Sequence, residues 1–186
     1  NGVIINFHNS LLPTNRGRNA PSWAIYNDDS ITGVTWHYVD SGVDTGAIIC
    51  QKSFDIREGS SALDVAKKCM ELGILSFKEF IDCLLEKGKC KVISPSGELG
   101  ELYLSHQVPN QGLIEFNDFS KAERTLRAMD YGPFSIFPKP RVMIDSKAFT
   151  VNSYRLSSTQ HNDGVYREGD NILFVKNKKL INLNIS

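Results

Sequence analysis

The sequence predicts a mixed α/β fold in the first part of the chain and a small β-rich extension after it. Apolar, β-branched stretches at residues 3–7, 31–39 and 47–54 are typical of strands, and the first has the character of a buried strand in a parallel sheet. A long helical pattern follows at residues 61–87. Beyond residue 141, strand-like stretches alternate with turn residues, which is typical of a β-rich segment.

The long helix is bounded by clear signals in the sequence. Ser61 and Asp64 have the spacing of a capping box, and Gly88 ends the pattern. Apolar side chains recur along it at steps of three and four, which predicts that one stripe faces the core. This stripe consists of Leu63, Ala66, Met70, Ile74, Phe77, Ile81 and Leu84.

The second part of the chain begins after an irregular stretch rich in proline and glycine. We therefore expect two parts, residues 1–110 and residues 111–186. Ser120 and Glu123 have the spacing of a second capping box, which predicts a helix ending near Asp130. Four strands are expected after that helix, at residues 142–144, 149–156, 172–175 and 180–185. The segment 171–183 is predicted to form a sheet edge that supports a homodimer.

Composition narrows the classes of function. Lys plus Arg and Asp plus Glu each number 21, and this zero net charge argues against capture of nucleic acid by bulk attraction. We expect no membrane partner, because no stretch is long and apolar enough to span a bilayer, and no signal peptide is evident, so the cytoplasm is the expected location. The four cysteines lack metal-ligand spacing, so no metal is expected. Because the chain opens directly on an apolar run, we expect the natural protein to have residues before it.

Three polar residues suggest a catalytic set. Asn6 and His8 are two apart on a predicted strand and so share one face, while Asp44 lies in a second loop. Acyl transfer to an amine requires a donor for the developing oxyanion, a group that accepts or relays a proton, and a carboxylate that orients the imidazole and raises its pKa. By spacing alone, the same residues also suit structural roles, because such histidines often only hydrogen-bond and Asn and Asp often form turns.

The sequence around these residues, over about residues 3–56, resembles the signature of the folate-dependent formyltransferase family. The matching stretches are residues 6–13 (NFHNSLLP), 16–17 (RG), 21–25 (PSWAI), 32–39 (TGVTWHYV) and 42–49 (GVDTGAII). The resemblance implies a Rossmann-like formyltransferase core, with 10-formyltetrahydrofolate as the donor of the formyl group. The family also has strands and helices before the Asn-x-His strand, and we expect this N-terminal part to be absent here.

The resemblance also implies roles for individual residues. It assigns Asn6, His8 and Asp44 to catalysis. The loop that wraps the pterin ring corresponds to Val39, Asp40, Ser41, Gly42, Val43 and Asp44. The positions bordering the acceptor site are Ser10, Leu11, Pro13 and Arg16. His37 matches a position near the active site, although a histidine that only pairs with a neighbouring strand would look the same.

Residues 114–139 resemble the C-terminal region of sugar-nucleotide N-formyltransferases, which implies a nucleotide-linked amino sugar as acceptor, such as dTDP-4-amino-4,6-dideoxyglucose. Arg124 and Arg127 lie three apart on a helix and are suited to binding a pyrophosphate, or alternatively form a solvated face. Tyr131 and Phe134 are suited to stacking on a base, or alternatively to packing in a core.

Other acceptors and a non-enzymatic role are the alternatives. A tRNA acceptor calls for a basic C-terminal domain, whereas this tail mixes lysines with acidic residues. Glycinamide ribonucleotide formyltransferases, by resemblance, lack a C-terminal β extension of this kind. A binding or dimerisation module that has lost catalysis is disfavoured because all three catalytic residues are present.

Overall fold

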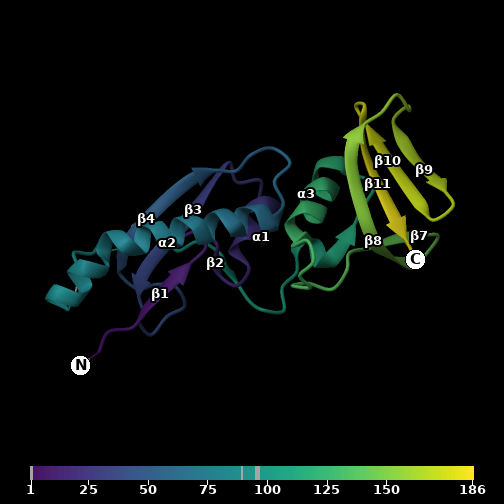
Figure 1. Ribbon diagram of the computed structural model, residues 1–186. Helices are drawn as coiled ribbons and strands as arrows, with labels where there is room; N and C mark the ends of the chain where they lie inside the picture. Colours follow the sequence, from purple (N-terminus) through teal and green to yellow (C-terminus); the bar gives the residue numbers. More distant parts are fainter. Residues whose placement is uncertain (1, 89, 95–96) are drawn as a thin grey trace. The chain divides into compact units, whose positions relative to one another are not determined.

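The computed structural model describes all residues except 1, 89, 95 and 96. The chain forms two compact units, residues 1–107 and residues 108–186, each with its own strands and helices (Figure 1). Among the residues that the structure describes, no helix is long and apolar enough to cross a membrane.

The first unit is built on a three-stranded antiparallel sheet in the order β1-β3-β4. Its elements are β1 (Ile5–His8), β2 (Arg16–Gly17), α1 (Ala20–Tyr26), β3 (Ile31–Tyr38), β4 (Ile48–Asp55), α2 (Ala62–Lys87) and β5 (Leu102–Tyr103). The strands β2 and β5 form a separate parallel pair. Helix α2 contacts β3 and β4 and runs along the sheet (Figure 1).

The expectation of a buried parallel strand at residues 3–7 is wrong for the described residues. Strand β1 pairs antiparallel with β3, and Val3 and Ile4 precede it with 52% and 71% of their surface exposed. The antiparallel register places Asn6 opposite His37. This pairing brings a second histidine beside the strand that carries the Asn-x-His motif.

The boundaries of α2 agree with the prediction, but its buried face does not. Ser61 and Asp64 form the capping box, and Gly88 ends the helix with a left-handed φ of 68°. The buried residues are Ala62, Val65, Cys69, Gly73, Ser76 and Phe80. Met70 and Ile74 of the predicted stripe are instead 53% and 58% exposed.

Small residues on α2 account for this shift of the buried face. A Cβ at Gly73 would collide with the ring of Phe7, so the glycine lets the helix approach the sheet closely. The indole Nε1 of Trp36 donates to the Gly73 carbonyl and lies equally close, at 3.2 Å, to Ser76 Oγ. The periodicity of apolar residues predicts which face of a helix is hydrophobic. The face of α2 that packs on the sheet is instead determined by the small size of Gly73 and by the hydrogen bond from Trp36 of β3.

The second unit is a six-stranded sheet with a helix against it, in the strand order β6-β7-β8-β11-β10-β9. Its elements are η1 (Pro109–Gly112), β6 (Leu113–Ile114), α3 (Phe119–Met129), β7 (Arg141–Ile144), β8 (Lys147–Ser158), β9 (Gly164–Glu168), β10 (Asn171–Lys176) and β11 (Lys179–Ile185). Its core unites Ala122 and Leu126 of α3 with apolar side chains of the sheet.

Two expectations for this unit need correction. Helix α3 is capped by Asp118, whose side chain accepts a hydrogen bond from the Lys121 backbone, and not by a box opening at Ser120. The segment 171–183 is not a sheet edge, because β10 pairs with β9 on one side and with β11 on the other. The short strand β9, which the sequence analysis did not anticipate, takes up that edge.

We expect Leu126→Ala to lower the free energy of unfolding of the second unit by about 2–5 kcal/mol, because the substitution leaves a cavity in a filled core. Leu126 is 1% exposed, whereas Leu85, also in a helix, is 76% exposed. Urea denaturation followed by circular dichroism measures the effect, with Leu85→Ala as the matched control. Equal midpoints for the two variants would contradict this account of the core.

Candidate active site

The carboxylate of Asp44 is the point at which the expected catalytic residues meet. Asp44 lies in the loop between β3 and β4, and its Oδ1 accepts a hydrogen bond of 3.2 Å from the Asn6 amide nitrogen. Its Oδ2 lies 3.4 Å from Nδ1 of His8. Asn6 and His8 both belong to β1 and, being two apart, point to the same face. The structure therefore brings together an amide, an imidazole and a carboxylate.

A second imidazole contacts the same carboxylate. Nε2 of His37 lies 3.4 Å from Asp44 Oδ1 and 3.2 Å from the amide nitrogen of Asn6. Its other ring nitrogen, Nδ1, lies 2.9 Å from the carbonyl oxygen of Tyr38. The His37 side chain is 3% exposed, compared with 7% for His8 and 10% for Asp44, so all three side chains are largely buried.

The loop that carries Asp44 is hydrogen-bonded to Arg16 and Gly17 of β2. The backbone N–H of Gly17 donates to Asp44 Oδ2 at 2.8 Å. The Arg16 guanidinium donates to the carbonyls of Val43 and Gly100 at 3.2 Å and 3.1 Å. Asp44 itself has a left-handed φ of 54°, a conformation that aspartate tolerates better than most residues. Several independent contacts thus fix the position of one carboxylate.

These contacts set the charge of Asp44. Burial raises the pKa of its carboxyl, but the hydrogen bond with His37, the charge of His8 and the Gly17 N–H outweigh burial and lower the pKa to about 2. Asp44 is therefore ionised at neutral pH.

The two histidines respond in opposite directions to their surroundings. Burial dominates at His8 and lowers its pKa, although Asp44 and the carbonyl of Asn15 act against it. Asp44 thus acts on His8 in the expected direction and raises its pKa, but burial outweighs the carboxylate and the net pKa is lowered. At His37, burial also lowers the pKa, but the hydrogen bond to Asp44 and the contact with Tyr38 outweigh it, and the net pKa is raised.

A positioning contact of His8 escaped the sequence analysis. The carbonyl of Asn15 accepts from His8 Nε2 at 2.9 Å, while the Asn15 side chain donates to Asp29 at 2.9 Å and accepts from Asn27 at 3.3 Å. Asn15 is buried in a left-handed conformation with φ 49°. The available signal was an asparagine next to the Arg16-Gly17 pair, since asparagine is enriched in that conformation.

The contact with Asn15 determines which nitrogen of His8 is chemically available. With Nε2–H donating to a carbonyl, the neutral ring has its lone pair on Nδ1, beside Asp44. Uptake of a proton at Nδ1 then creates an imidazolium 3.4 Å from a carboxylate that is already ionised. This arrangement is suited to a general base whose charged form is stabilised as it develops.

The other residues expected around the site occupy the same unit. Ser10 is fully buried, and its hydroxyl donates to the Thr14 carbonyl. Leu11 lines a cavity of about 460 Å³ beside the Asn15 network, and Pro13 follows a cis peptide bond. In the loop of residues 39–44, Asp40 accepts from the Gly42 N–H and the Thr45 hydroxyl.

The remaining predicted residues belong to the second unit. Arg124 and Arg127 lie on α3, and Arg127 Nε is 3.4 Å from the carboxylate of Glu123. The Tyr131 ring lies 6.2 Å from that of Phe137, centroid to centroid. Phe134 is 61% exposed.

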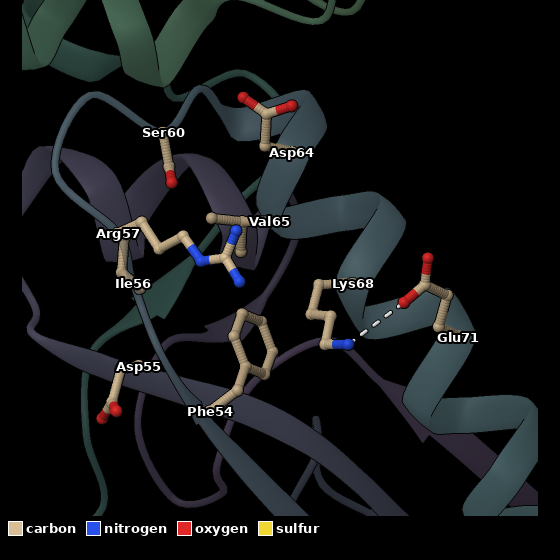
Figure 2. Close-up of a pocket in the computed structure, with 9 residues that line it drawn as sticks. All are labelled: Phe54, Asp55, Ile56, Arg57, Ser60, Asp64, Val65, Lys68 and Glu71. Carbon is tan, nitrogen blue, oxygen red and sulfur yellow. Dashed lines mark hydrogen bonds and ion pairs between the residues drawn. The ribbon is translucent and has the colours of Figure 1, made fainter.

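A larger cavity of about 590 Å³ lies between the end of β4 and the start of α2 (Figure 2). In Figure 2 the side chains of Arg57 and Lys68 extend toward the ring of Phe54, and the Lys68 amine pairs with Glu71 at 3.2 Å. Its lining, within the described residues, contains none of the residues expected in the site. Nor do the described His, Cys, Asp and Glu residues form a group suited to a metal ion.

We expect the stability difference between the wild type and Asp44→Asn to depend on pH. The folded-state pKa of Asp44 is about 2, below its ordinary value of 3.8, so its contribution is fully present above pH 3.8 and is lost as pH falls toward 2. Urea denaturation at a series of pH values measures the difference. Asp145→Asn, at an exposed aspartate with φ 47°, is the matched control. A difference that stays constant between pH 7 and pH 3 would refute the assignment.

Comparison with known proteins shows that the first part of the chain is similar to one family. Residues 1–79 match the model of the formyl transferase family. The chain is 33% identical over 152 residues to a GDP-perosamine N-formyltransferase of Brucella melitensis, a match that covers 80% of the chain and 55% of the relative. It is 36% identical over 118 residues to a methionyl-tRNA formyltransferase of Thermodesulfovibrio yellowstonii, which covers 63% of the chain and 37% of the relative.

A solved structure extends the likeness to nearly the whole chain. The N-formyltransferase of Helicobacter canadensis, crystallised with folinic acid and dTDP-3-aminofucose, superposes with a TM-score of 0.71 at 19% identity. The match covers 98% of this chain and 66% of that protein, and so indicates a common fold. The chain spans about half the length of the Brucella relative. Residues 1–79, which match the formyl transferase family model, thus contain Asp44 together with Asn6, His8, Gly17 and His37, which contact its carboxylate.

Proposed function

We propose that this chain transfers a formyl group from 10-formyltetrahydrofolate to the amine of a nucleotide-linked amino sugar. The observation that carries the proposal is the convergence of Asn6 and His8 on the ionised carboxylate of Asp44, inside a segment that matches the formyl transferase family. The choice of a sugar acceptor is supported by the similarity to a GDP-perosamine N-formyltransferase over 80% of the chain.

The chemistry assigns a role to each of the three residues. The acceptor amine forms a bond to the formyl carbon, and the bond from that carbon to the folate nitrogen breaks. The folate nitrogen keeps the electron pair of the broken bond and receives, by way of His8, the proton that the amine loses. Nδ1 of His8 takes the proton that the amine loses, and Asp44 stabilises the resulting imidazolium. The amide of Asn6 donates to the formyl oxygen as negative charge develops there.

The loop of residues 39–44 is proposed to hold the folate. Val39 and Val43 are 48% and 50% exposed and offer apolar surface to a flat ring. The turn around Asp40 holds the backbone between them in a set shape. Ser41 and Gly42 complete the loop, which ends at the catalytic carboxylate.

The remaining predicted residues are proposed to recognise the acceptor. In the first unit these are Ser10, Leu11, Pro13, Arg16 and His37. Arg124 and Arg127 are assigned to the pyrophosphate, and Tyr131 and Phe134 to the base. Residues 1–110 then supply part of the catalytic core and residues 111–186 an extension that recognises the nucleotide.

We further propose that the protein acts in the cytoplasm as a homodimer, without a nucleic-acid or membrane partner. The balanced charge of the chain supports the absence of a nucleic-acid partner. The exposed strand edge of the second sheet at β9 is a candidate for the contact between subunits.

The direct test is an assay of the full chain with 10-formyltetrahydrofolate and a panel of dTDP-, UDP- and GDP-linked amino sugars. We expect one sugar to gain the mass of a formyl group. His8→Ala is expected to reduce kcat by about 10²–10⁴, the range for a removed general base. His106→Ala, at an exposed histidine of the same unit, serves as the control. Formylation of methionyl-tRNA, together with no formylation of any sugar in the panel, would reject the sugar acceptor. Full activity of the His8→Ala variant would reject the role of His8 as general base.

A second prediction concerns the acceptor site. We expect Arg127→Ala to raise KM for the sugar nucleotide about tenfold or more, because a charged hydrogen bond to the pyrophosphate is lost, and to leave KM for the folate nearly unchanged. Steady-state kinetics with each substrate varied in turn measures both constants. Arg141→Ala, an exposed arginine at the start of β7, is the control. A larger change in KM for the folate would remove Arg127 from the acceptor site.

A further inference from the structure

The amide of Asn6 is fully engaged within the catalytic set. An amide nitrogen carries two N–H donors, and that of Asn6 lies 3.2 Å from Asp44 Oδ1 and 3.2 Å from His37 Nε2. If both contacts are hydrogen bonds, neither donor is left for a formyl oxygen. The catalytic task assigned to Asn6 therefore depends on releasing one of them.

The orientation of this amide is determined by its neighbours. Asp44 is ionised and only accepts, so the Asn6 nitrogen, and not its oxygen, must face it. His37 directs Nδ1 at the Tyr38 carbonyl, which places a hydrogen on Nδ1 in every protonation state. Neutral His37 consequently has its lone pair on Nε2, where it accepts from Asn6.

Protonation of His37 reverses this contact. The new Nε2–H is a donor and cannot accept from Asn6, but Asp44 Oδ1 is 3.4 Å away and can receive it. Asn6 keeps its bond to Asp44, because a carboxylate oxygen accepts more than one hydrogen bond. One N–H of Asn6 is then released.

We propose that His37 is a positioning residue that controls Asn6: its protonated form releases one amide N–H of Asn6, and its neutral form occupies that N–H. The hydrogen-bond exchange follows from the geometry of the four side chains. Its consequence for catalysis, an available donor to the formyl oxygen, rests on the proposed function.

The charges around His37 favour the form that releases the donor. Asp44 and Asp40 both attract a proton to the ring, while His8 is the positive neighbour that opposes it when charged. The net effect raises the pKa of His37 and lowers that of His8. His37 therefore keeps its proton to higher pH than His8 does. Between the two midpoints a charged His37 coexists with a neutral His8, and both contact the same carboxylate.

The exchange is testable without any activity. In the full chain labelled with ¹⁵N, we expect the side-chain amide resonances of Asn6 to shift with pH at the midpoint of the His37 ring, separately from that of His8. The His37 ring is expected to hold its proton on Nδ1 above that midpoint. Asn6 resonances that do not follow His37, or a neutral His37 protonated on Nε2, would overturn the proposal.

Single substitutions test whether the titration of His37 causes the shift of the Asn6 amide resonances. His37→Gln removes the titrating ring and is expected to abolish the pH-dependent shift of the Asn6 amide, whereas His106→Gln leaves it unchanged. Asp44→Asn is expected to move the His37 midpoint and the Asn6 shift together to lower pH. Separation of the two midpoints in Asp44→Asn would count against the coupling. Because the wild-type titration stands alone, the test survives even if a variant does not fold.

Kinetics separates this inference from the proposed function. We expect kcat for formyl transfer to fall by up to about tenfold, about 1.4 kcal/mol and the size of one net hydrogen bond, as pH rises through the His37 midpoint. KM for the sugar nucleotide should stay unchanged across this range, and His37→Gln should lose this limb of the profile. Coupled resonances without formyl transfer would refute the proposed function and leave the exchange standing. Formyl transfer with uncoupled resonances would refute only the role of His37.

Discussion

The ionised carboxylate of Asp44 is the constraint on which the rest of the site depends. Each of its oxygens has two neighbours: Oδ2 faces the Gly17 N–H and His8, and Oδ1 faces Asn6 and His37. A buried carboxylate without such partners would take up a proton and lose its ability to orient them. Here donors and positive charge outweigh burial, so the negative charge persists and organises three side chains from two strands.

The carboxylate of Asp44 thus contacts two imidazoles whose pKa values are shifted in opposite directions. His8 and His37 lie at the same distance from Asp44, yet the pKa of one is lowered and that of the other raised. At His8, burial outweighs the charge of Asp44 and the carbonyl of Asn15. At His37, the hydrogen bond to Asp44, the contact with Tyr38 and the charge of Asp40 together outweigh burial. Two titratable groups whose environments push their pKa values apart are a common basis for dividing acid and base roles.

The framework explains how these contacts are kept in place. The antiparallel pairing of β1 with β3 sets Asn6 opposite His37 and so decides which histidine stands beside the motif. Helix α2 packs close to these strands through Gly73 and Ser76, with Trp36 hydrogen-bonded to the helix. The loop of Asp44 is tied separately to β2 by Arg16 and Gly17.

The sequence by itself determined the two main helices, most of the longer strands and the motif. Capping at Ser61, the glycine stop of α2 and the alternation on β1 depend on local chemistry, and the Asn-x-His spacing places two side chains on one face whatever the fold. Only the tertiary structure decided the rest. These features are the buried face of α2, the edge strand β9, the contact of the Asn15 carbonyl with His8 and the contact of His37 with Asn6. They depend on residues that are distant in sequence or on backbone groups, which are the same in every residue and so leave no signal in the sequence. The pKa directions belong to this second group, because burial and neighbouring charge exist only once the chain has folded.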